Sequence, residues 1–400
     1  MNQQPVILAD AFTRSGLAVA RSLGRHGLKV IAVSRTSRNL VARSRFVTEN
    51  LVGPDPVTDR DGYASFIADV ATRHEPSLVI PVTDAAVSAL SERREHLPPA
   101  TRLALPDVAV VRSVLDKRLN LEVARAAGIP CPADYGSLSR ERLAGTGEEL
   151  EFPIVLKNAD PDNKTLNHPL PFRVALAKDM QELETLLTVV EQSDSDVLFQ
   201  QFISGGVKNV CVFAIEGVVQ GMHGYQSIRR TLHEGIARET IALPENIAGH
   251  VRDLMRALRW TGIALVQFLI DAESGEPFYM ETNGRFWAST QGSIHAGWNF
   301  PVWQYEYFVN GQKPDIQPIQ LGSRTVYRKA DLVQLLRYWL GGRPPSVGSR
   351  GRLSAAWQVL QDCRPSVHSD VGSWSDPLPS LWDALDTFRP SNFRKSRDYF

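Results

Sequence analysis

Residues 261–290 read TGIALVQFLIDAESGEPFYMETNGRFWAST, and this stretch decides how the rest of the chain is interpreted. Residues 263–270 form an apolar run of strand length, and a turn-rich segment separates them from a second short run at residues 278–281. This pattern predicts an antiparallel hairpin. If Ile270 faces Phe278 across the hairpin, Gln267 lies opposite Glu281.

Three polar side chains of this hairpin are expected to converge. Side chains alternate along a strand, so Glu281 and Asn283 point the same way, and Gln267 joins them from the paired strand. One carboxylate and two amide carbonyls suit a hard cation such as Mg²⁺ (or Mn²⁺) that is shared with phosphates. Arg285 would add a guanidinium for a phosphoryl oxygen. The alternative is a hairpin whose Asn-Gly pair only makes a turn and whose Glu281 is a surface acid.

The hairpin resembles the end of the nucleotide site in the ATP-grasp superfamily. The last motif of that superfamily reads approximately Glu-Ile-Asn-Pro-Arg, and here residues 281–285 read Glu-Thr-Asn-Gly-Arg. Gln267 stands where many members carry an acid, and the carbamoyl phosphate synthetase branch is similar in using Gln. The resemblance extends over roughly residues 1–315. It implies the ATP-grasp fold, an α/β architecture in which two α+β lobes clasp ATP.

The N-terminal part alternates strands and helices. Strands are expected at residues 6–9, 29–33 and 78–81, which indicates βαβ units. The loop at residues 9–16 has one glycine where a dinucleotide fingerprint needs three, so NAD is not indicated. This part resembles the small doubly wound pre-ATP-grasp domain. Its strand ends would place residues 10–15 and 83–84 at the acceptor side, although ordinary helix-capping loops explain them equally well.

We therefore expect three parts. Residues 1–112 would form a pre-ATP-grasp Rossmann-like domain. Residues 113–315 would form the ATP-grasp domain, with lobe one at about 113–200 and lobe two at about 201–315. Beyond residue 316 the pattern changes to helical spacing over residues 330–340, 353–360 and 377–388, which predicts a mostly helical C-terminal extension.

Two lysines are candidates for binding nucleotide phosphate. Lys117 lies in a segment that resembles the first ATP-grasp motif, at the position that contacts phosphate. Lys157 ends the apolar strand predicted at residues 152–157, where an ammonium group must find a partner or reach water. Residues 160–168 contain no glycine where the family normally has a glycine-rich lid. Lys164 and Arg173 are the charge donors available in its place.

The strand expected at residues 197–203 ends in the segment that reads adenine in the family. The resemblance assigns Gln200, Gln201, Phe202 and Ile203 to this hinge, with Gln201 replacing the usual Glu. Further on, Arg229 and Arg230 follow a predicted strand. Paired arginines there would hold a substrate carboxylate or the transferred phosphoryl group. Solvated charges at a strand end are an equally good explanation.

The resemblance implies an ATP-dependent, ADP-forming carboxylate-amine ligase. A carboxylate oxygen would attack the γ-phosphorus of ATP, an acyl phosphate would form, and an amine would displace phosphate. The alternatives are a carboxylase or carbamoyl-phosphate-type enzyme, a nucleotide-binding protein without turnover, and a dehydrogenase on the first βαβ unit. The assigned residues are Lys117, Lys157, Gln200, Gln201, Phe202 and Ile203 for nucleotide, Gln267, Glu281 and Asn283 for metal, and Arg285, Arg229 and Arg230 for catalysis.

Composition sets the remaining expectations. The chain has 400 residues, 43% of them hydrophobic, which is enough for two or three domains with cores. Its 44 basic and 44 acidic residues balance, so we expect small-molecule carboxylate and amine substrates and neither nucleic acid nor a membrane as a partner. A homodimer is compatible with this composition. The three separated cysteines and the absence of a signal-peptide pattern or long apolar run favour a cytoplasmic protein.

Overall fold

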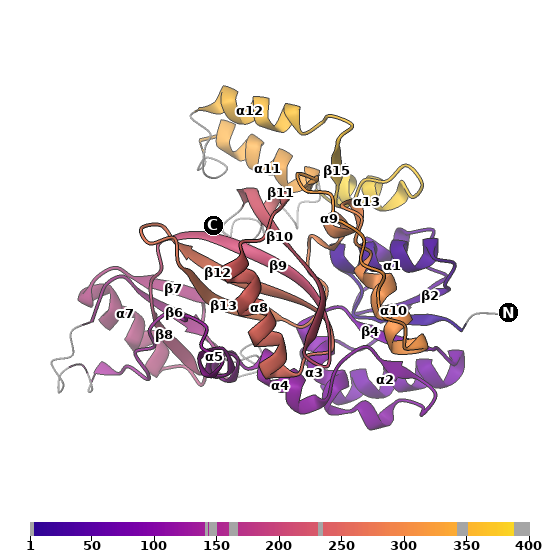
Figure 1. Cartoon of the computed structure of the whole chain (residues 1–400), viewed down its shortest axis with the longest axis horizontal. Helices are drawn as coiled ribbons and strands as arrows, with labels where there is room; N and C mark the ends of the chain where they lie inside the picture. Colours follow the sequence, from indigo (N-terminus) through magenta and orange to yellow (C-terminus); the bar gives the residue numbers. More distant parts are fainter. Residues whose placement is uncertain are drawn as a thin grey trace.

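The computed structural model describes residues 4–140, 143, 150–159, 167–230, 235–341 and 351–387. Its strands form a five-stranded, a three-stranded and a seven-stranded sheet (Figure 1). Among these residues, no helix combines the length and the apolarity that crossing a membrane requires.

The five-stranded sheet is parallel and has the order β3-β2-β1-β4-β5. Every residue of β1 and β4 is buried, because helices cover both faces of the sheet. The carboxyl ends of these two central strands meet, and Thr83 Oγ1 donates to Asp10 Oδ2 at 2.6 Å. The elements are β1 (Val6–Ala9), α1 (Arg14–Arg25), β2 (Val30–Ser34), β3 (Glu49–Val52), α2 (Arg60–His74), β4 (Leu78–Pro81), α3 (Asp84–Glu92), β5 (Arg102–Leu103) and α4 (Val108–Leu115).

The three-stranded sheet is antiparallel, with β6 (Ile154–Asn158) between β7 (Val174–Ala177) and β8 (Val197–Gln201). Ile154 and Leu156 point into a core that they share with Leu183 and Leu187 of α7 (Met180–Glu191). Side chains alternate along β6, so Lys157 lies on the opposite face.

The seven-stranded sheet is the centre of the molecule and has the order β13-β12-β9-β10-β11-β14-β15. Helices α5 (Lys117–Ala126) and α8 (Glu245–Leu258) cover one face, where Val210 and Val266 are buried. Helices α9 (Thr290–His295) and α10 (Phe300–Asn310) and the N-terminal sheet lie on the other face, with Cys211 and Leu265. The strands are β9 (Gly205–Ile215), β10 (Val218–Arg230), β11 (Gly235–Ile241), β12 (Gly262–Asp271), β13 (Pro277–Asn283), β14 (Arg324–Val326) and β15 (Val367–Ser369).

The C-terminal segment contains the expected helices, α11 (Arg328–Trp339), α12 (Arg352–Gln361) and α13 (Leu378–Thr387). It also contributes β14 and β15 to the central sheet, which the sequence pattern did not predict because each strand has only three residues. A buried ion pair between Arg21 of α1 and Asp376 (2.8 Å) ties the segment to the N-terminal sheet domain. The segment is therefore part of the main body.

Candidate nucleotide and metal site

The β12–β13 hairpin forms as predicted, and Gln267 lies opposite Glu281. The pairing near the turn is different: Ile270 pairs with Pro277, so the predicted Ile270–Phe278 pair is wrong by one residue. A bulge at Met280, between the Phe268–Tyr279 and Gln267–Glu281 pairs, adds one residue to β13 and corrects the register. The predicted pair at the site is right because the one-residue error at the turn is compensated by the extra residue of the bulge.

The three predicted ligands converge. Asn283 Nδ2 donates to Glu281 Oε1 at 3.0 Å and to Gln267 Oε1 at 3.4 Å. Tyr279 and Thr282 face the other side of the hairpin, where their hydroxyl groups lie 2.7 Å apart. The side chains of Glu281 and Asn283 therefore share one face, as strand alternation predicts.

Asn209 of β9 is a fourth polar neighbour that sequence reasoning missed. It pairs with Gln267 across the ladder, and Gln267 Nε2 donates to Asn209 Oδ1 at 2.7 Å. The only signal in the sequence is a polar residue before the apolar run at residues 210–215. That signal gains meaning only once β9 is known to pair with β12.

The donor set fits a metal ion that is shared with phosphate. It offers one carboxylate and amide oxygens, all hard ligands for Mg²⁺. Within the described ranges, no group of three or more His, Cys, Asp or Glu side chains is assembled to hold a metal. One carboxylate leaves most of an octahedral shell to be supplied by phosphate oxygens and water.

Two lysines bring positive charge to this carboxylate. Burial lowers the pKa of Lys157 on β6, Glu281 raises it, and Lys117 lowers it again. Lys117 is the first residue of α5, and its ammonium group donates to the carbonyl of Asn158. Lys157 therefore faces one carboxylate and a second cation, so an anion placed between the sheets would be stabilised.

The hinge residues differ in where their side chains lie. Gln200 is 1% exposed, and its Nε2 atom has no hydrogen-bond partner in the described part of the chain. Gln200 pairs with Val155, so its side chain shares the face of the small sheet that carries Lys157. Gln201 lies on the other face, and its Oε1 accepts from the backbone N–H of Ala133 at 3.3 Å. Hence Gln200, rather than Gln201, has a side chain available to a nucleotide.

The other two hinge residues flank the end of β8. Phe202 is partly exposed and Ile203 is buried. The predicted lid lies mostly outside the described residues, which omit 160–166.

Arg285 connects the site to the N-terminal sheet domain. Its Nε and Nη2 atoms donate to the two carboxylate oxygens of Asp84 at 3.1 and 3.0 Å, and Nη2 also donates to Asn283 Oδ1 at 3.2 Å. Burial alone would lower the pKa of Arg285, but Asp84 and Glu281 raise it. Asp84 starts α3 directly after β4, so the predicted acceptor loop at residues 83–84 does reach the hairpin.

Arg229 and Arg230 are not brought to the hairpin. They end β10, two strands away from β12 in the sheet order. Arg229 is buried and donates to Asp331 (2.8 Å) and Asp362 (2.5 Å) of the C-terminal segment. Its charge is engaged by these carboxylates, so it joins the C-terminal segment to the sheet. Arg230 is exposed.

A row of polar residues crosses the sheet from the hairpin. Glu281, Gln267, Asn209, Tyr225 and Thr240 are successive partners on five neighbouring strands. Partners in a ladder point to the same face, so the row leads from the candidate metal site across β9 to β10 and β11.

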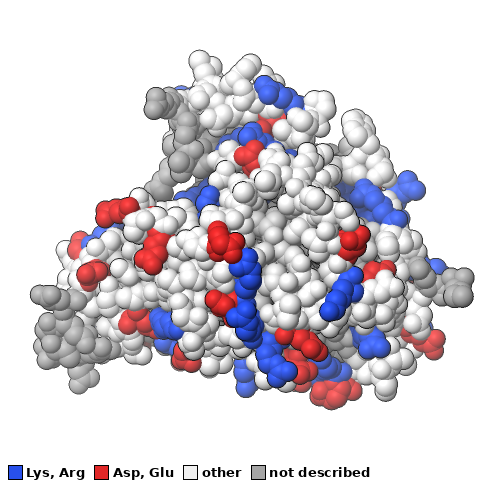
Figure 2. All heavy atoms as spheres, in the orientation of Figure 1, with Lys and Arg blue, Asp and Glu red and all other residues white. Residues whose placement is uncertain are grey.

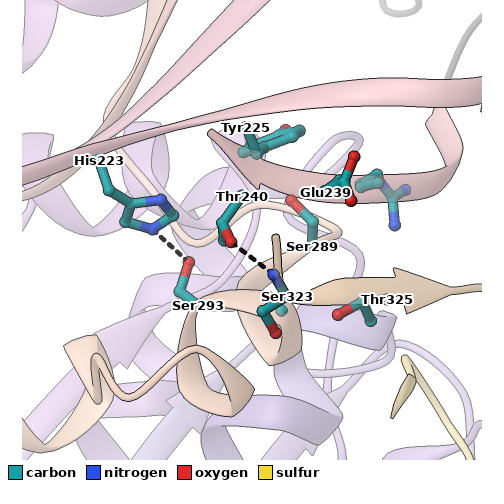
Figure 3. Close-up of a pocket in the computed structure, with 10 residues that line it drawn as sticks. His223, Tyr225, Glu239, Thr240, Ser289, Ser293, Ser323 and Thr325 are labelled. Atoms are coloured by element: carbon teal, nitrogen blue, oxygen red, sulfur yellow. Dashed lines mark hydrogen bonds between the residues drawn. The ribbon is translucent and has the colours of Figure 1, made fainter. Parts of the chain in front are cut away.

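The row ends at a polar pocket between β10, β11, α9 and β14 (Figure 3). The Ser323 and Thr325 hydroxyl groups that line it are buried without a hydrogen-bond partner among the described residues. His223 shares a hydrogen bond of 2.9 Å with Ser293, and burial lowers its pKa to about 4. The imidazole is therefore neutral at physiological pH.

The comparisons with known proteins agree with this geometry. No protein-family model matches the chain. It is 26% identical over 192 residues to the D-alanine--D-alanine ligase of Carboxydothermus hydrogenoformans, a match that covers 42% of this chain and 58% of that enzyme. The chain thus matches less than two thirds of the relative's length.

Two solved structures are similar. An L-amino acid ligase from Bacillus licheniformis superposes with a TM-score of 0.60 at 18% identity, over 77% of this chain and 74% of that one. The biotin carboxylase domain dimer of Hydrogenobacter thermophilus 2-oxoglutarate carboxylase, in complex with MgADP, ADP and bicarbonate, gives 0.63 at 15% identity, over 81% and 74%. The chain has the ATP-grasp fold, as the resemblance in the sequence predicts.

Proposed function

We propose that this protein is an ADP-forming ligase that joins the carboxylate of a small molecule to an amine. The observation that carries the proposal is the convergence of Gln267, Glu281 and Asn283 beside Lys157, which comes from a different sheet. Two of the similar proteins, the D-alanine--D-alanine ligase and the L-amino acid ligase, bear names of this reaction class.

In this proposal Glu281 and Asn283 of β13 and Gln267 of β12 would hold Mg²⁺, which would supply positive charge to neutralise the phosphates. Lys157 and Lys117 hold the phosphates, since phosphoryl transfer needs positioning and charge neutralisation more than a protein nucleophile.

The hinge would hold the base of the nucleotide. Gln200 offers a buried amide that lacks a partner in the described part of the chain, and this fits a polar adenine edge. The backbone of Gln201, Phe202 and Ile203 completes the hinge, as the family resemblance suggests.

Arg285 would stabilise the charge that develops on the transferred phosphoryl group. A bond forms between a carboxylate oxygen and the γ-phosphorus, and the bond to the β–γ bridging oxygen breaks, so ADP leaves. The amine nitrogen then attacks the acyl carbon, phosphate leaves, and the amine loses a proton. The ion pair with Asp84 would orient the guanidinium group of Arg285 toward the site.

A carboxylase is the second candidate, because the carboxylase domain with bicarbonate has the same fold. A nucleotide-binding protein without turnover is the third, because residues 160–168 lack glycine. An ADP-release assay with Mg-ATP separates the three. Release that needs both a carboxylic acid and an amine supports the ligase, and release that needs bicarbonate supports the carboxylase. Tight Mg-ATP binding without either kind of ADP release would support the nucleotide-binding protein without turnover.

A further inference from the structure

Helices α11 and α12 lie side by side at the edge of the molecule farthest from α2 (Figure 1). The side of α11 that faces the body is polar, since Asp331 and Gln334 are buried there. α12 buries Ala355, and Asp362 follows the helix directly. Asp331 and Asp362 bind Arg229 of the central sheet, so these contacts fix which side of α11 and which end of α12 face inward.

The sides that face away from the body are apolar. Leu332, Leu336 and Trp339 of α11 repeat at i, i+4 and i+7, which places them on one stripe. Leu353, Trp357 and Leu360 of α12 repeat with the same spacing. All six are between 46% and 77% exposed. A surface helix normally buries its apolar stripe and exposes its polar one, so α11 is inverted, and α12 adds a second exposed apolar stripe.

We call these six residues and Leu340, which is 88% exposed, the outer patch. Single exposed leucines are common on protein surfaces, but a contiguous apolar patch marks an interaction site. The outer patch exposes about 800 Å², which is the area that each partner contributes to a standard protein interface. Figure 2 shows this end of the molecule with few charged side chains.

We propose that the outer patch binds the outer patch of a second copy of this chain, so that the α11–α12 pairs of two copies form a four-helix bundle. Two helices with parallel apolar stripes cannot close a core alone, and two more helices of the same pattern complete it. A two-fold axis brings the same patch of both copies together. Asp331 and Asp362 face inward and bind Arg229, so neither carboxylate is presented on the outer patch to a basic partner.

The test measures the mass of the full chain in solution by light scattering and sedimentation. We expect a dimer for the natural chain and a monomer for the double variant L336E/W357E. The matched control is L321E/W374E, which changes one exposed Leu and one exposed Trp outside the patch and should stay dimeric. Because all four side chains are largely exposed, circular dichroism should be the same for all three proteins.

A milder variant, Leu353→Ser, guards against loss of folding and should raise the dimer dissociation constant at least about tenfold. A monomeric natural chain would overturn the proposal, and so would dissociation of the control. Binding of the monomer to phosphatidylserine-containing vesicles, lost in L336E/W357E, would instead identify the patch as a membrane-docking face. None of these outcomes depends on the ligase activity, which is measured separately by ADP release.

Discussion

Two charged clusters on the central sheet differ in their charge balance. At the hairpin, Lys117, Lys157 and Arg285 surround two carboxylates, Glu281 and Asp84. Among these five described groups, the cations outnumber the carboxylates by one. Desolvated cations without a matching number of carboxylates are stabilised when an anionic ligand binds.

The second cluster lies at the C-terminal end of the sheet and is balanced. Arg229 contacts Asp331 and Asp362 at 2.6 and 2.5 Å, and Arg324 contacts Asp362 at 3.0 Å and Glu239 at 3.6 Å. Arg328 also acts on Asp331, so three arginines meet three carboxylates. A buried set of this kind has no charge left for a ligand, although breaking it is costly. The comparison teaches that an arginine pair in the sequence does not reveal whether it binds substrate or joins two parts of the chain.

The largest expected effect comes from breaking the balanced cluster. Arg229→Ala leaves Asp331 and Asp362 buried with less compensation, so the free energy of unfolding should fall by about 3–5 kcal/mol. Arg112→Ala, at an exposed position of α4, should change it by less than about 0.5 kcal/mol. Urea unfolding measures both. Equal losses of unfolding free energy in the two variants would mean that the Arg229 cluster does not hold the C-terminal segment to the sheet.

The next effect concerns His223, at the polar pocket between the two clusters. Its pKa is about 4 in the folded protein because of burial, against 6.5 for an ordinary imidazole. Between these values the unfolded chain binds a proton that the folded chain does not bind. The contribution of His223 to the free energy of unfolding is therefore fully present above pH 6.5. It should fall by about 3 kcal/mol on acidification to pH 4.

Replacing the titrating group tests this directly. His223→Gln should reduce the dependence of the unfolding free energy on pH between 6.5 and 4, while His295, whose pKa burial also lowers to about 4, keeps its own contribution. His96→Gln, at an exposed position, should leave the slope unchanged. An unchanged slope in His223→Gln would show that the imidazole is protonated inside the fold.

A smaller effect is expected at the cluster with excess charge. Glu281→Ala should lower ADP release at saturating Mg²⁺ by roughly 100-fold, because a metal ligand is lost. Its unfolding free energy should change by less than about 1 kcal/mol. Glu276→Ala, on the exposed turn of the same hairpin, is the matched control and should keep full activity. Full activity of Glu281→Ala would remove the metal assignment.

The smallest effect is expected at Asp84. Asp84→Asn weakens the partly exposed bidentate pair that orients Arg285, which should raise KM about fivefold and leave stability within about 1 kcal/mol. Asp69→Asn, on the exposed side of α2, serves as the control. A change in stability without a change in KM would assign Asp84 to domain packing alone.

The sequence revealed the hairpin and the convergence of its three candidate ligands because strand alternation and a short turn constrain neighbouring residues. It placed Gln267 opposite Glu281 correctly, although the bulge at Met280 has no signature in the residues themselves. The resemblance to the ATP-grasp superfamily rested on the motif that contains Glu281, Asn283 and Arg285, and the fold agrees with it. Local periodicity was therefore enough for the part of the site that lies within about twenty residues of chain.

The remaining features depend on partners that are distant in sequence. Arg229 and Asp362 are 133 positions apart, so no local pattern distinguished a structural arginine from a catalytic one. Asn209 joins the site only through the pairing of β9 with β12. The prediction assigned both Gln200 and Gln201 to the hinge, and only the register of β8 with β6 shows that their side chains lie on opposite faces of the small sheet.

The most direct test of the charge-excess account is a crystal structure with Mg²⁺ and a nonhydrolysable ATP analogue. We predict a metal ion about 2.1 Å from oxygens of Glu281 and Asn283, with Lys157 at the phosphates and the base beside Gln200. A nucleotide bound elsewhere, or a metal ion that none of the hairpin side chains contacts, would contradict the account.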